Sequence, residues 1–381
     1  MIDGTCSEDF LPLRDLLEKN LATGEDAGAG VAVVHDGELV VDLWGGEARP
    51  GVPWERDTVT LVWSVSKSMS ALGVLTLVEQ GLVDLDEPVA SYWPEFGAHG
   101  KDAVLVRHVL GHTSGVPGWT DPISFEDALD LPLAESRLAA QEPWYEPGSA
   151  PAYQIIDHGH LLDGVVRGAT GRTLANVVND DVMARVGGGF RLGVPEAELD
   201  RVADLVPPPG TDVDYAAMHP EHFMLRTVTN PFLAPDLVNG DAWRLGANGA
   251  TGGHGNARGI ALAQSALSHG GTASGGSGRG VDLLSPSTIE RVFEVQAEGP
   301  DLVLDVPVRY GIGYALPMPA APAVPAGRTC WWTGYGGAIV VNDLDRRTTF
   351  AYTPNKLAVH MVASPRTDAY VRTAFGCLDD A

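Results

Sequence analysis

The sequence predicts an α/β fold: an antiparallel sheet built from both chain ends and flanked by helices, with an inserted, mainly helical lobe. Hairpin patterns lie near both ends, whereas the long middle has helix and loop patterns. The chain is 44% hydrophobic and 20% charged, which allows a large core. We expect one unit over residues 1–381, with a sheet lobe at about 1–63 and 300–381 and a helical lobe at about 64–299.

The N-terminal part predicts a helix and then a hairpin. Apolar residues recur at helical spacing over residues 9–22. Two apolar runs follow, Val31–Val34 and Leu39–Leu43, on either side of Asp36-Gly37. Asp-Gly favours a tight turn because glycine adopts positive φ without steric cost. We therefore expect two paired strands in this region.

The C-terminal part predicts a second hairpin and a closing helix. Strands are expected near 338–342 and 347–352, on either side of the polar turn Asp343–Arg346. A helix is expected from about 366 to 378. The sheet would thus draw its strands from both ends of the chain.

The middle of the chain, from about 64 to 300, predicts mostly helices and loops. Helical patterns cover Ser68–Gln80, Gln154–Val166, Arg172–Arg185 and Asn256–Leu267. Glycine- and proline-rich connectors at His269–Gly280 and Pro317–Gly327 are typical of surface loops. We expect Asn256 to cap the helix that begins beside it.

The charge balance bears on the partners of the protein. Fifty acidic residues against 25 basic ones give a net charge of −25. A field of this sign repels phosphate backbones and anionic lipids, so we expect neither a nucleic-acid partner nor a membrane-surface partner. A small-molecule substrate fits this charge better.

Cysteine usage and hydropathy indicate the compartment. The three cysteines, Cys6, Cys330 and Cys377, show no metal-ligand spacing and no disulfide framework. The first residues lack a basic segment followed by an apolar stretch, and no run of about 18 apolar residues follows. We expect a cytoplasmic protein.

The sharpest local signal is the pair Ser64 and Lys67 at the start of a strongly apolar helix. A spacing of three residues places both side chains on one helix face. A serine hydroxyl needs an adjacent base to become a nucleophile, and a lysine desolvated by an apolar helix has a lowered pKa and can be that base. The pattern predicts a serine nucleophile, and the alternative is a helix cap beside a solvated lysine.

Other chemistries have weaker support. Ser66 and Ser68 are competing nucleophiles, but they point to other helix faces and have no lysine three residues later. The chain has no G-x-S-x-G elbow, no H-E-x-x-H zinc motif and no phosphate-binding loop. His158 and His160 are more typical of packed residues than of metal ligands. We therefore expect no metal and no cofactor.

Further blocks follow in order along the chain. They are EQGLVDLDEPVASYWPEF at 79–96, VRHVLGHTSGVPGW at 106–119, EPGSAPAYQIIDHGHLLDGVVRGATGR at 146–172 and GATGGHGNARGIA at 249–261. Together with SVSK at 64–67, they resemble the serine β-lactamase and penicillin-binding-protein superfamily, most closely its class C-like esterase branch. The resemblance covers about 28 to 355 and implies a β-lactamase-like fold.

The resemblance also implies roles for residues far from Ser64. Tyr153 occupies the place of the tyrosine that relays a proton between the serine and the leaving group. The backbone N–H groups of Ser64 and Tyr335 would form the oxyanion hole. His112–Gly115 would be a turn that packs under the site. Trp119, Trp144 and Trp243 could either wall an acyl pocket or belong to the core.

The substrate-binding positions depart from those of β-lactam hydrolases. Trp332-Thr333-Gly334 stands where relatives have a cationic third block, and Ile155 stands where they have asparagine. These substitutions remove a charge and an amide that would bind a β-lactam. The implied activity is hydrolysis of carboxylic esters, or of amides, through a Ser64 acyl-enzyme. Two alternatives remain: a transacylase that passes the acyl group to an amine or alcohol, and a class C-like β-lactamase or penicillin-recognising binding protein. The acyl group, the acceptor and the oligomeric state stay open.

Overall fold

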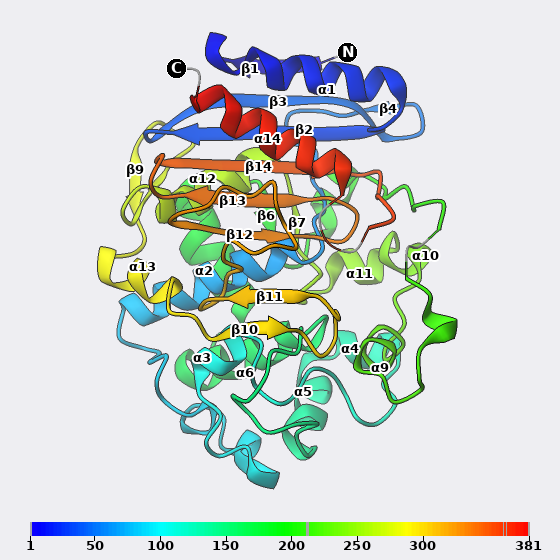
Figure 1. Cartoon of the computed structure of the whole chain (residues 1–381), viewed down its shortest axis with the longest axis vertical. Coiled ribbons are helices and arrows are strands. Elements are labelled where there is room, and N and C mark those ends of the chain that lie inside the picture. The colour runs from blue at the N-terminus through cyan, green and yellow to red at the C-terminus, as the bar shows by residue number, and fades with distance from the viewer. Residues whose placement is uncertain (1, 211–212, 361, 363, 380–381) are drawn as a thin grey trace.

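The computed structural model describes residues 2–210, 213–360, 362 and 364–379. Its main sheet has the order β1-β3-β2-β14-β13-β12, all antiparallel, with β4 paired to the outer part of β3. The strands are β1 (Ile2–Cys6), β2 (Gly28–His35), β3 (Glu38–Arg49), β4 (Val52–Pro53), β12 (Thr329–Thr333), β13 (Ile339–Asp343) and β14 (Thr348–Pro354). Figure 1 shows blue N-terminal strands beside orange C-terminal strands, which confirms the predicted fold class.

The two chain ends meet at the centre of this sheet. Strand β2 pairs with β14 along its length, with Ala32 opposite Ala351. Beside this seam, Asp26 accepts hydrogen bonds from the hydroxyls of Tyr352 at 2.5 Å and Tyr370 at 2.7 Å. Its carboxylate also lies 3.3 Å from the guanidinium of Arg366. The C-terminal segment is therefore fixed to the N-terminal one by both backbone and side chains.

Helices cover the sheet. Helices α1 (Leu11–Thr23) and α14 (Pro365–Asp379) pack together, and α14 also contacts β14. Helix α12 (Ala257–Ser268) packs against β2, β13 and β14 behind the strands as drawn in Figure 1. It lies within the stretch predicted as the helical lobe, yet it rests on the sheet. As expected, the Asn256 side chain caps it by accepting the Gly259 N–H at 2.8 Å.

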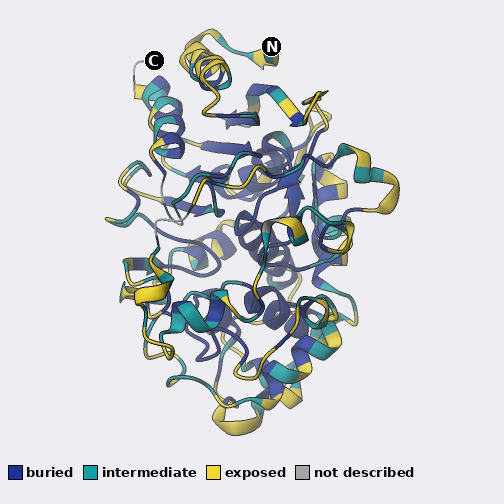
Figure 2. Cartoon of the chain, turned by 90° about the vertical axis from the view of Figure 1, so that its right-hand side faces the viewer, coloured by how far each residue is buried: buried dark blue, intermediate teal, exposed yellow. Residues whose placement is uncertain are grey.

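Helix α2 (Val65–Glu79) packs against β12 of the sheet as well as against helices of the helical lobe, and it is buried from Val65 to Leu77. A helix that is apolar on all sides is stable only inside a core, and Figure 2 shows the buried segments gathered in the middle of the molecule. The other helices are α3 (Val106–Leu110), α4 (Phe125–Leu129), α5 (Leu131–Ala140), α6 (Asp157–Thr170), α7 (Leu174–Asn176), α8 (Ala184–Val186), α9 (Phe223–Val228), α10 (Pro235–Val238), α11 (Asp241–Leu245) and α13 (Pro286–Val292).

Short elements complete the chain. The predicted helix Arg172–Arg185 is divided into α7, the π-helix η4 (Val177–Met183) and α8. The 3₁₀ segments are η1 (Glu8–Phe10), η2 (Val89–Ser91), η3 (Pro94–Gly100), η5 (Glu196–Arg201) and η6 (Tyr215–Ala217). The minor strands are β5 (Thr60–Leu61), β6 (Phe190–Arg191), β7 (His254–Gly255), β8 (Thr272–Ser274), β9 (Gly280–Asp282), β10 (Ala297–Pro300) and β11 (Pro307–Tyr310). Within the described ranges, no helix is long and apolar enough to cross a bilayer.

Candidate active site

Ser64 is placed by a tight turn between β5 and α2. Trp63 has a φ of 48°, in the left-handed region that non-glycine residues seldom adopt. Such strained positions cluster at functional sites, where the surrounding structure holds them in place. Ser64 follows as the N-cap of α2 and is 8% exposed. Its hydroxyl therefore lies at the positive end of the helix dipole, where a developing anion is stabilised.

Lys67 lies one turn further along α2 and is 1% exposed. Its Nζ donates to Ser64 Oγ at 3.2 Å, as the spacing predicted. It also donates to two backbone carbonyls, those of Ile155 at 2.8 Å and Ala250 at 3.2 Å. Burial lowers the pKa of this lysine to about 7, so a substantial share of it is a neutral amine at neutral pH. That amine can accept the Ser64 proton.

Tyr153 approaches the pair from the segment that leads into α6. The Lys67 Nζ lies 4.8 Å from the centre of its ring. Burial raises the pKa of the Tyr153 phenol, although hydrogen bonds with Ser64 and Trp332 oppose that rise. The phenol therefore stays protonated at neutral pH and can give or relay a proton.

The end of β12 closes against the Ser64 turn. A Cβ at Gly334 would lie 2.2 Å from the carbonyl oxygen of Val62, so only glycine permits this approach. The ring of the next residue, Tyr335, meets Trp63 edge-on with centroids 5.7 Å apart. Gly334 and the Tyr335 ring thus lie against the Ser64 turn, where the family resemblance implies an oxyanion donor from the Tyr335 backbone.

An aromatic stack supports this end of β12. Trp332 stacks on His112 with centroids 5.3 Å apart and on Tyr310 at 5.8 Å. His112 also accepts the Gln154 backbone N–H at Nδ1, at 3.2 Å. Burial holds the pKa of His112 well below its usual value, so the ring is neutral. The turn that begins at His112 therefore packs under the site, as predicted.

Comparison with known proteins agrees with this geometry. The family profile described as Beta-lactamase matches residues 13–374. The chain belongs to the beta-lactamase family.

Its relatives include esterases as well as penicillin-binding proteins. The Esterase/beta-lactamase LipL of Mycobacterium tuberculosis is 32% identical over 351 residues, which cover 88% of this chain and 78% of LipL. A crystal structure of a family VIII carboxylesterase has a TM-score of 0.90 and 30% identity, covering 99% of this chain and 100% of its own. A penicillin-binding protein homologue from Caulobacter crescentus has a TM-score of 0.89 and 31% identity, with the same coverage. The chain is thus a serine hydrolase of this family, and the resemblance stated from its motifs is confirmed.

In this beta-lactamase family member, Ser64 opens onto a cavity of about 390 Å³. Of the predicted positions, Ser64, Tyr153, Ile155, Trp332, Thr333 and Tyr335 line the cavity. Lys67 lies behind Ser64, and Gly334 lies against the Val62–Trp63 backbone. The remaining described lining residues are Trp63, Ile156, Leu205, Pro207, Pro208, Gly210, Tyr215, Val228, Pro231, Phe232, Leu233, Val238, Thr251, Leu304, Tyr310, Ala315, Met318, Trp331, Leu357 and Val362.

The cavity wall carries no charge among its described residues, since none is Asp, Glu, Lys, Arg or His. Arg309 and Arg328, which are near Trp332 in the sequence, are paired instead with Glu298 at 3.4 Å and with Glu290. Neither arginine lines the cavity. The pocket of this hydrolase therefore favours neutral, apolar groups, because a buried unpaired charge is costly.

Sequence reasoning missed residues 205–210 and 213–238, many of which line the cavity. At one end, the Asn239 side chain accepts the Leu205 N–H at 2.8 Å and donates to the Leu205 carbonyl at 3.0 Å. In the middle, the Arg226 guanidinium lies 3.6 Å from the centre of the Trp144 ring. Prolines interrupt any periodic pattern in this segment, so no local signal tied it to Ser64. Trp119, Trp144 and Trp243 do not line the cavity.

The competing candidates have other functions in the fold. The hydroxyls of Ser66 and Ser68 are fully buried and donate to backbone carbonyls of Trp63 and Val65. Ser66 Oγ also accepts the Gly253 N–H at 2.9 Å, which joins α2 to the residue before β7. His160 bonds the Ala128 carbonyl at 2.9 Å. Across the described ranges, no group of three or more His, Cys, Asp or Glu side chains could hold a metal ion.

Proposed function

We propose that this protein hydrolyses carboxylic esters through a Ser64 acyl-enzyme. The observation that carries the proposal is the 3.2 Å contact between Ser64 Oγ and a buried Lys67 whose pKa is about 7. Lys67 would act as general base, Tyr153 as the acid that protonates the leaving alkoxide, and the backbone N–H groups of Ser64 and Tyr335 as the oxyanion hole. The named esterases among the relatives support the same activity.

The reaction would proceed in two halves. Ser64 Oγ attacks the ester carbonyl while its proton moves to the neutral amine of Lys67. The alkoxide leaves as an alcohol with the proton of the Tyr153 phenol, and the Lys67 ammonium gives that proton back to Tyr153. A water molecule then attacks the acyl-enzyme, and the same residues return the proton to Ser64. All groups required for these steps belong to the chain itself.

The substrate class follows from the uncharged cavity. A wall formed by apolar residues and a few hydroxyls would bind a neutral ester with an apolar acyl or alkoxy group. Trp332 and Ile155 offer no charge or amide to the carboxylate and side chain of a penicillin. We therefore rank β-lactam hydrolysis and simple penicillin binding below ester hydrolysis.

Acyl transfer is the second candidate, and the same cavity favours it. An activated water needs two to four polar partners, which an apolar wall supplies poorly. An alcohol or amine can bind there by apolar contact. Transfer would be measured by adding a small alcohol at millimolar concentration and comparing the ester formed with the acid released; a share above the mole fraction of the alcohol would support a transferase.

Ser64→Ala and Ser66→Ala form the matched pair that tests the nucleophile. We expect wild type and Ser66→Ala to gain one acyl mass on intact-protein mass spectrometry with p-nitrophenyl esters, and Ser64→Ala to gain none and to lose turnover. Retained turnover in Ser64→Ala would refute the assignment.

Substrate charge provides the second test. p-Nitrophenyl hexanoate and the mono-p-nitrophenyl ester of adipic acid have similar length, but the latter carries a carboxylate. We expect hydrolysis of the neutral ester to be faster by one to two decades, since a charged hydrogen bond missing from the pocket is worth about 1.5–3 kcal/mol. Equal kcat/KM values would contradict an uncharged substrate site.

A further inference from the structure

A buried carboxyl group near Lys67 has no part in the mechanism above. Asp157 is the first residue of α6 and is 1% exposed. Its Oδ2 accepts a hydrogen bond from the side-chain amide of Gln154 at 3.2 Å. Among the ion pairs between described residues, none involves Asp157. Burying an ionised acid without a contacting cation costs several kcal/mol of folding free energy.

The Gln154 side chain holds Asp157 in place. Its Nε2 also lies 3.1 Å from Ser114 Oγ and 3.1 Å from the Val116 carbonyl, in the turn under the site. Its Oε1 is buried without a hydrogen-bond partner. All the hydrogen bonds of the Gln154 side chain are thus made by its amide nitrogen, and one of them goes to the Asp157 carboxyl.

Lys67 is a cation close to Asp157, because its Nζ donates to the carbonyl of Ile155, two residues before Asp157, at 2.8 Å. Helices α2 and α6 pack against each other, and attraction between the two side chains raises the pKa of Lys67 and lowers that of Asp157. Burial acts more strongly and in the opposite sense on each group. Both therefore titrate at about 7, where small changes in either charge alter the other.

The other titratable groups around Lys67 are neutral. Burial holds the pKa values of His112 and His158 well below their usual value, and both rings feel the lysine charge. Burial raises the pKa of the Tyr153 phenol. Of the described groups that act on Lys67, Asp157 is therefore the one that becomes negatively charged as pH rises through about 7.

We propose that Asp157 is a positioning residue for the Ser64–Lys67 pair: its buried carboxylate, held by Gln154, stabilises the ammonium that Lys67 becomes on taking the Ser64 proton. The inference rests on the proposed function. It makes Asp157 a determinant of the pH at which the enzyme becomes active, without contact with substrate. Lys67 keeps its hydrogen bonds to carbonyl oxygens, and the carboxylate supplies a counter-charge at longer range.

Asp157→Asn tests this directly because asparagine is isosteric and can still accept from Gln154. The measurement is kcat/KM for p-nitrophenyl butyrate from pH 5 to 9.5. Without the carboxylate the Lys67 ammonium is less stable, so we expect the acid limb to move to lower pH by roughly one unit. The plateau should fall several-fold because the lysine is a weaker base. An acid limb at the wild-type pH would overturn the inference.

Two further variants make the test robust. Asp163→Asn removes another buried acid of α6, one that pairs with Arg167, and should leave the acid limb unchanged; a shift equal to that of Asp157→Asn would point to a general effect and overturn the inference. Gln154→Met removes the hydrogen bond that lowers the pKa of Asp157. Asp157 would then be ionised less, so the acid limb should shift in the same direction as in Asp157→Asn. It carries the test if circular dichroism shows that Asp157→Asn is unfolded, and an unshifted limb would again refute the inference.

Failure of the proposed function gives a different result. In that case wild type itself gains no acyl mass at Ser64 with p-nitrophenyl butyrate. Failure of the Asp157 inference alone leaves wild type acylated and the variant pH profiles superimposable.

Discussion

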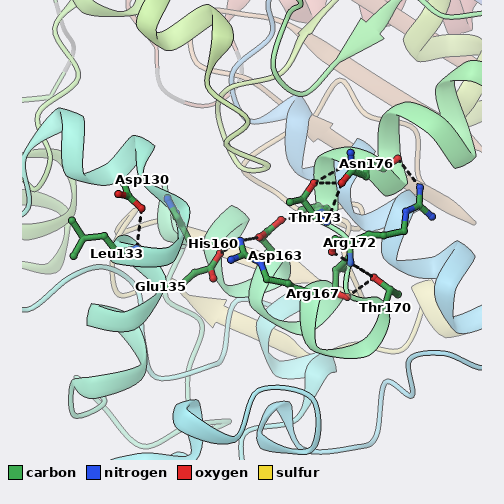
Figure 3. A network of polar contacts seen from close by, with 12 residues as sticks. Asp130, Leu133, Glu135, His160, Asp163, Arg167, Thr170, Arg172, Thr173 and Asn176 are labelled. Carbon is green, nitrogen blue, oxygen red and sulfur yellow. Dashed lines mark hydrogen bonds and ion pairs between the residues drawn. The ribbon is translucent and has the colours of Figure 1, made fainter.

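Two cations in the helical lobe, Lys67 and Arg167, are bound in contrasting ways. Arg167 reaches from α6 to two carboxyl groups, donating to Glu135 at 3.1 Å and to Asp163, as Figure 3 shows. Asp163 also accepts the Leu174 N–H at 2.6 Å, which joins α6 to α7. Lys67 instead contacts a hydroxyl and two carbonyls, and its carboxylate partner, Asp157, lies outside contact distance.

The contrast separates a structural cation from a reactive one. A guanidinium stays charged at any physiological pH, and that of Arg167 bonds directly to two carboxyl groups, so it holds helices together. An ammonium surrounded by neutral acceptors loses more from desolvation than it regains, so Lys67 can release its proton near neutral pH. The same lobe thus contains one cation that keeps its charge, Arg167, and one that can exchange a proton near neutral pH, Lys67.

The largest expected effect is on rate, at the reactive cation. Lys67→Ala and Tyr153→Phe should each lower kcat/KM for an aryl ester by about 10²–10⁴, the usual scale for a general acid or base. Because the two residues act as a unit, the double variant should lose much less than the product of the two losses. Multiplicative losses would mean that they do not share a proton path. Arg167→Lys is the control and should keep the wild-type rate.

The next effect is on stability, at the structural cation. Arg167→Leu leaves the Glu135 and Asp163 carboxyls without their cation. Since the arginine side chain is one-third exposed, the loss should be about 2 kcal/mol rather than the 3–5 kcal/mol of a fully buried pair. Urea unfolding measures the loss. Activity per folded molecule should stay at the wild-type level, and a large fall in kcat would contradict a purely structural role.

The third prediction is the pH dependence of the wild-type enzyme. The base form of Lys67 is the neutral amine, and its pKa of about 7 is lowered mainly by burial. The rate of acylation should therefore rise as pH increases through about 7 and level off above it. Stopped-flow release of p-nitrophenol gives this profile. A rate that keeps rising to pH 10 would mean that Lys67 titrates at its ordinary value.

The smallest effect concerns Glu135. Burial and the neighbouring Asp163 raise its pKa from 4.5 to about 8, so the folded protein binds a proton there that the unfolded chain has released. The resulting stability is fully present below about 4.5 and is lost as pH rises through about 8. Glu135→Gln should flatten the fall in Tm between pH 5 and 8.5. An unchanged slope would assign that fall to other groups.

Local patterns predicted most of the fold because they rest on short-range physics. The apolar runs around Asp36-Gly37 and the alternation around Asp343–Arg346 both form hairpins, as β2–β3 and β13–β14. The spacing of Ser64 and Lys67 likewise predicted that their side chains meet, and they are joined by a hydrogen bond. Helix α6 begins at Asp157, three residues later than predicted, because the preceding residues turn to place Tyr153 at the cavity.

The parts that could not be predicted depend on distant segments. The carbonyl of Ala250 accepts a hydrogen bond from Lys67, 183 residues away in the sequence. The wall residues in 205–210 and 213–238 are anchored by Asn239 and Arg226, through contacts that no local pattern predicts. The acid Asp157 has no motif of its own. The cytoplasmic location, the lack of nucleic-acid and membrane partners, the lobe boundaries and the roles of the site residues stay predictions.

The pairing of β2 with β14 also means that the sheet cannot be completed until the end of the chain has been synthesised. His35 and Thr348, which bond across that seam, are 313 residues apart. On the ribosome the N-terminal hairpin emerges with one long edge unpaired, and such an edge can pair with other chains until its partner arrives. The helical lobe is made in the interval, so Ser64, Lys67 and Tyr153 all leave the ribosome before β14 does. Until β14 is released, the edge of β2 that pairs with it has no partner strand in the sheet.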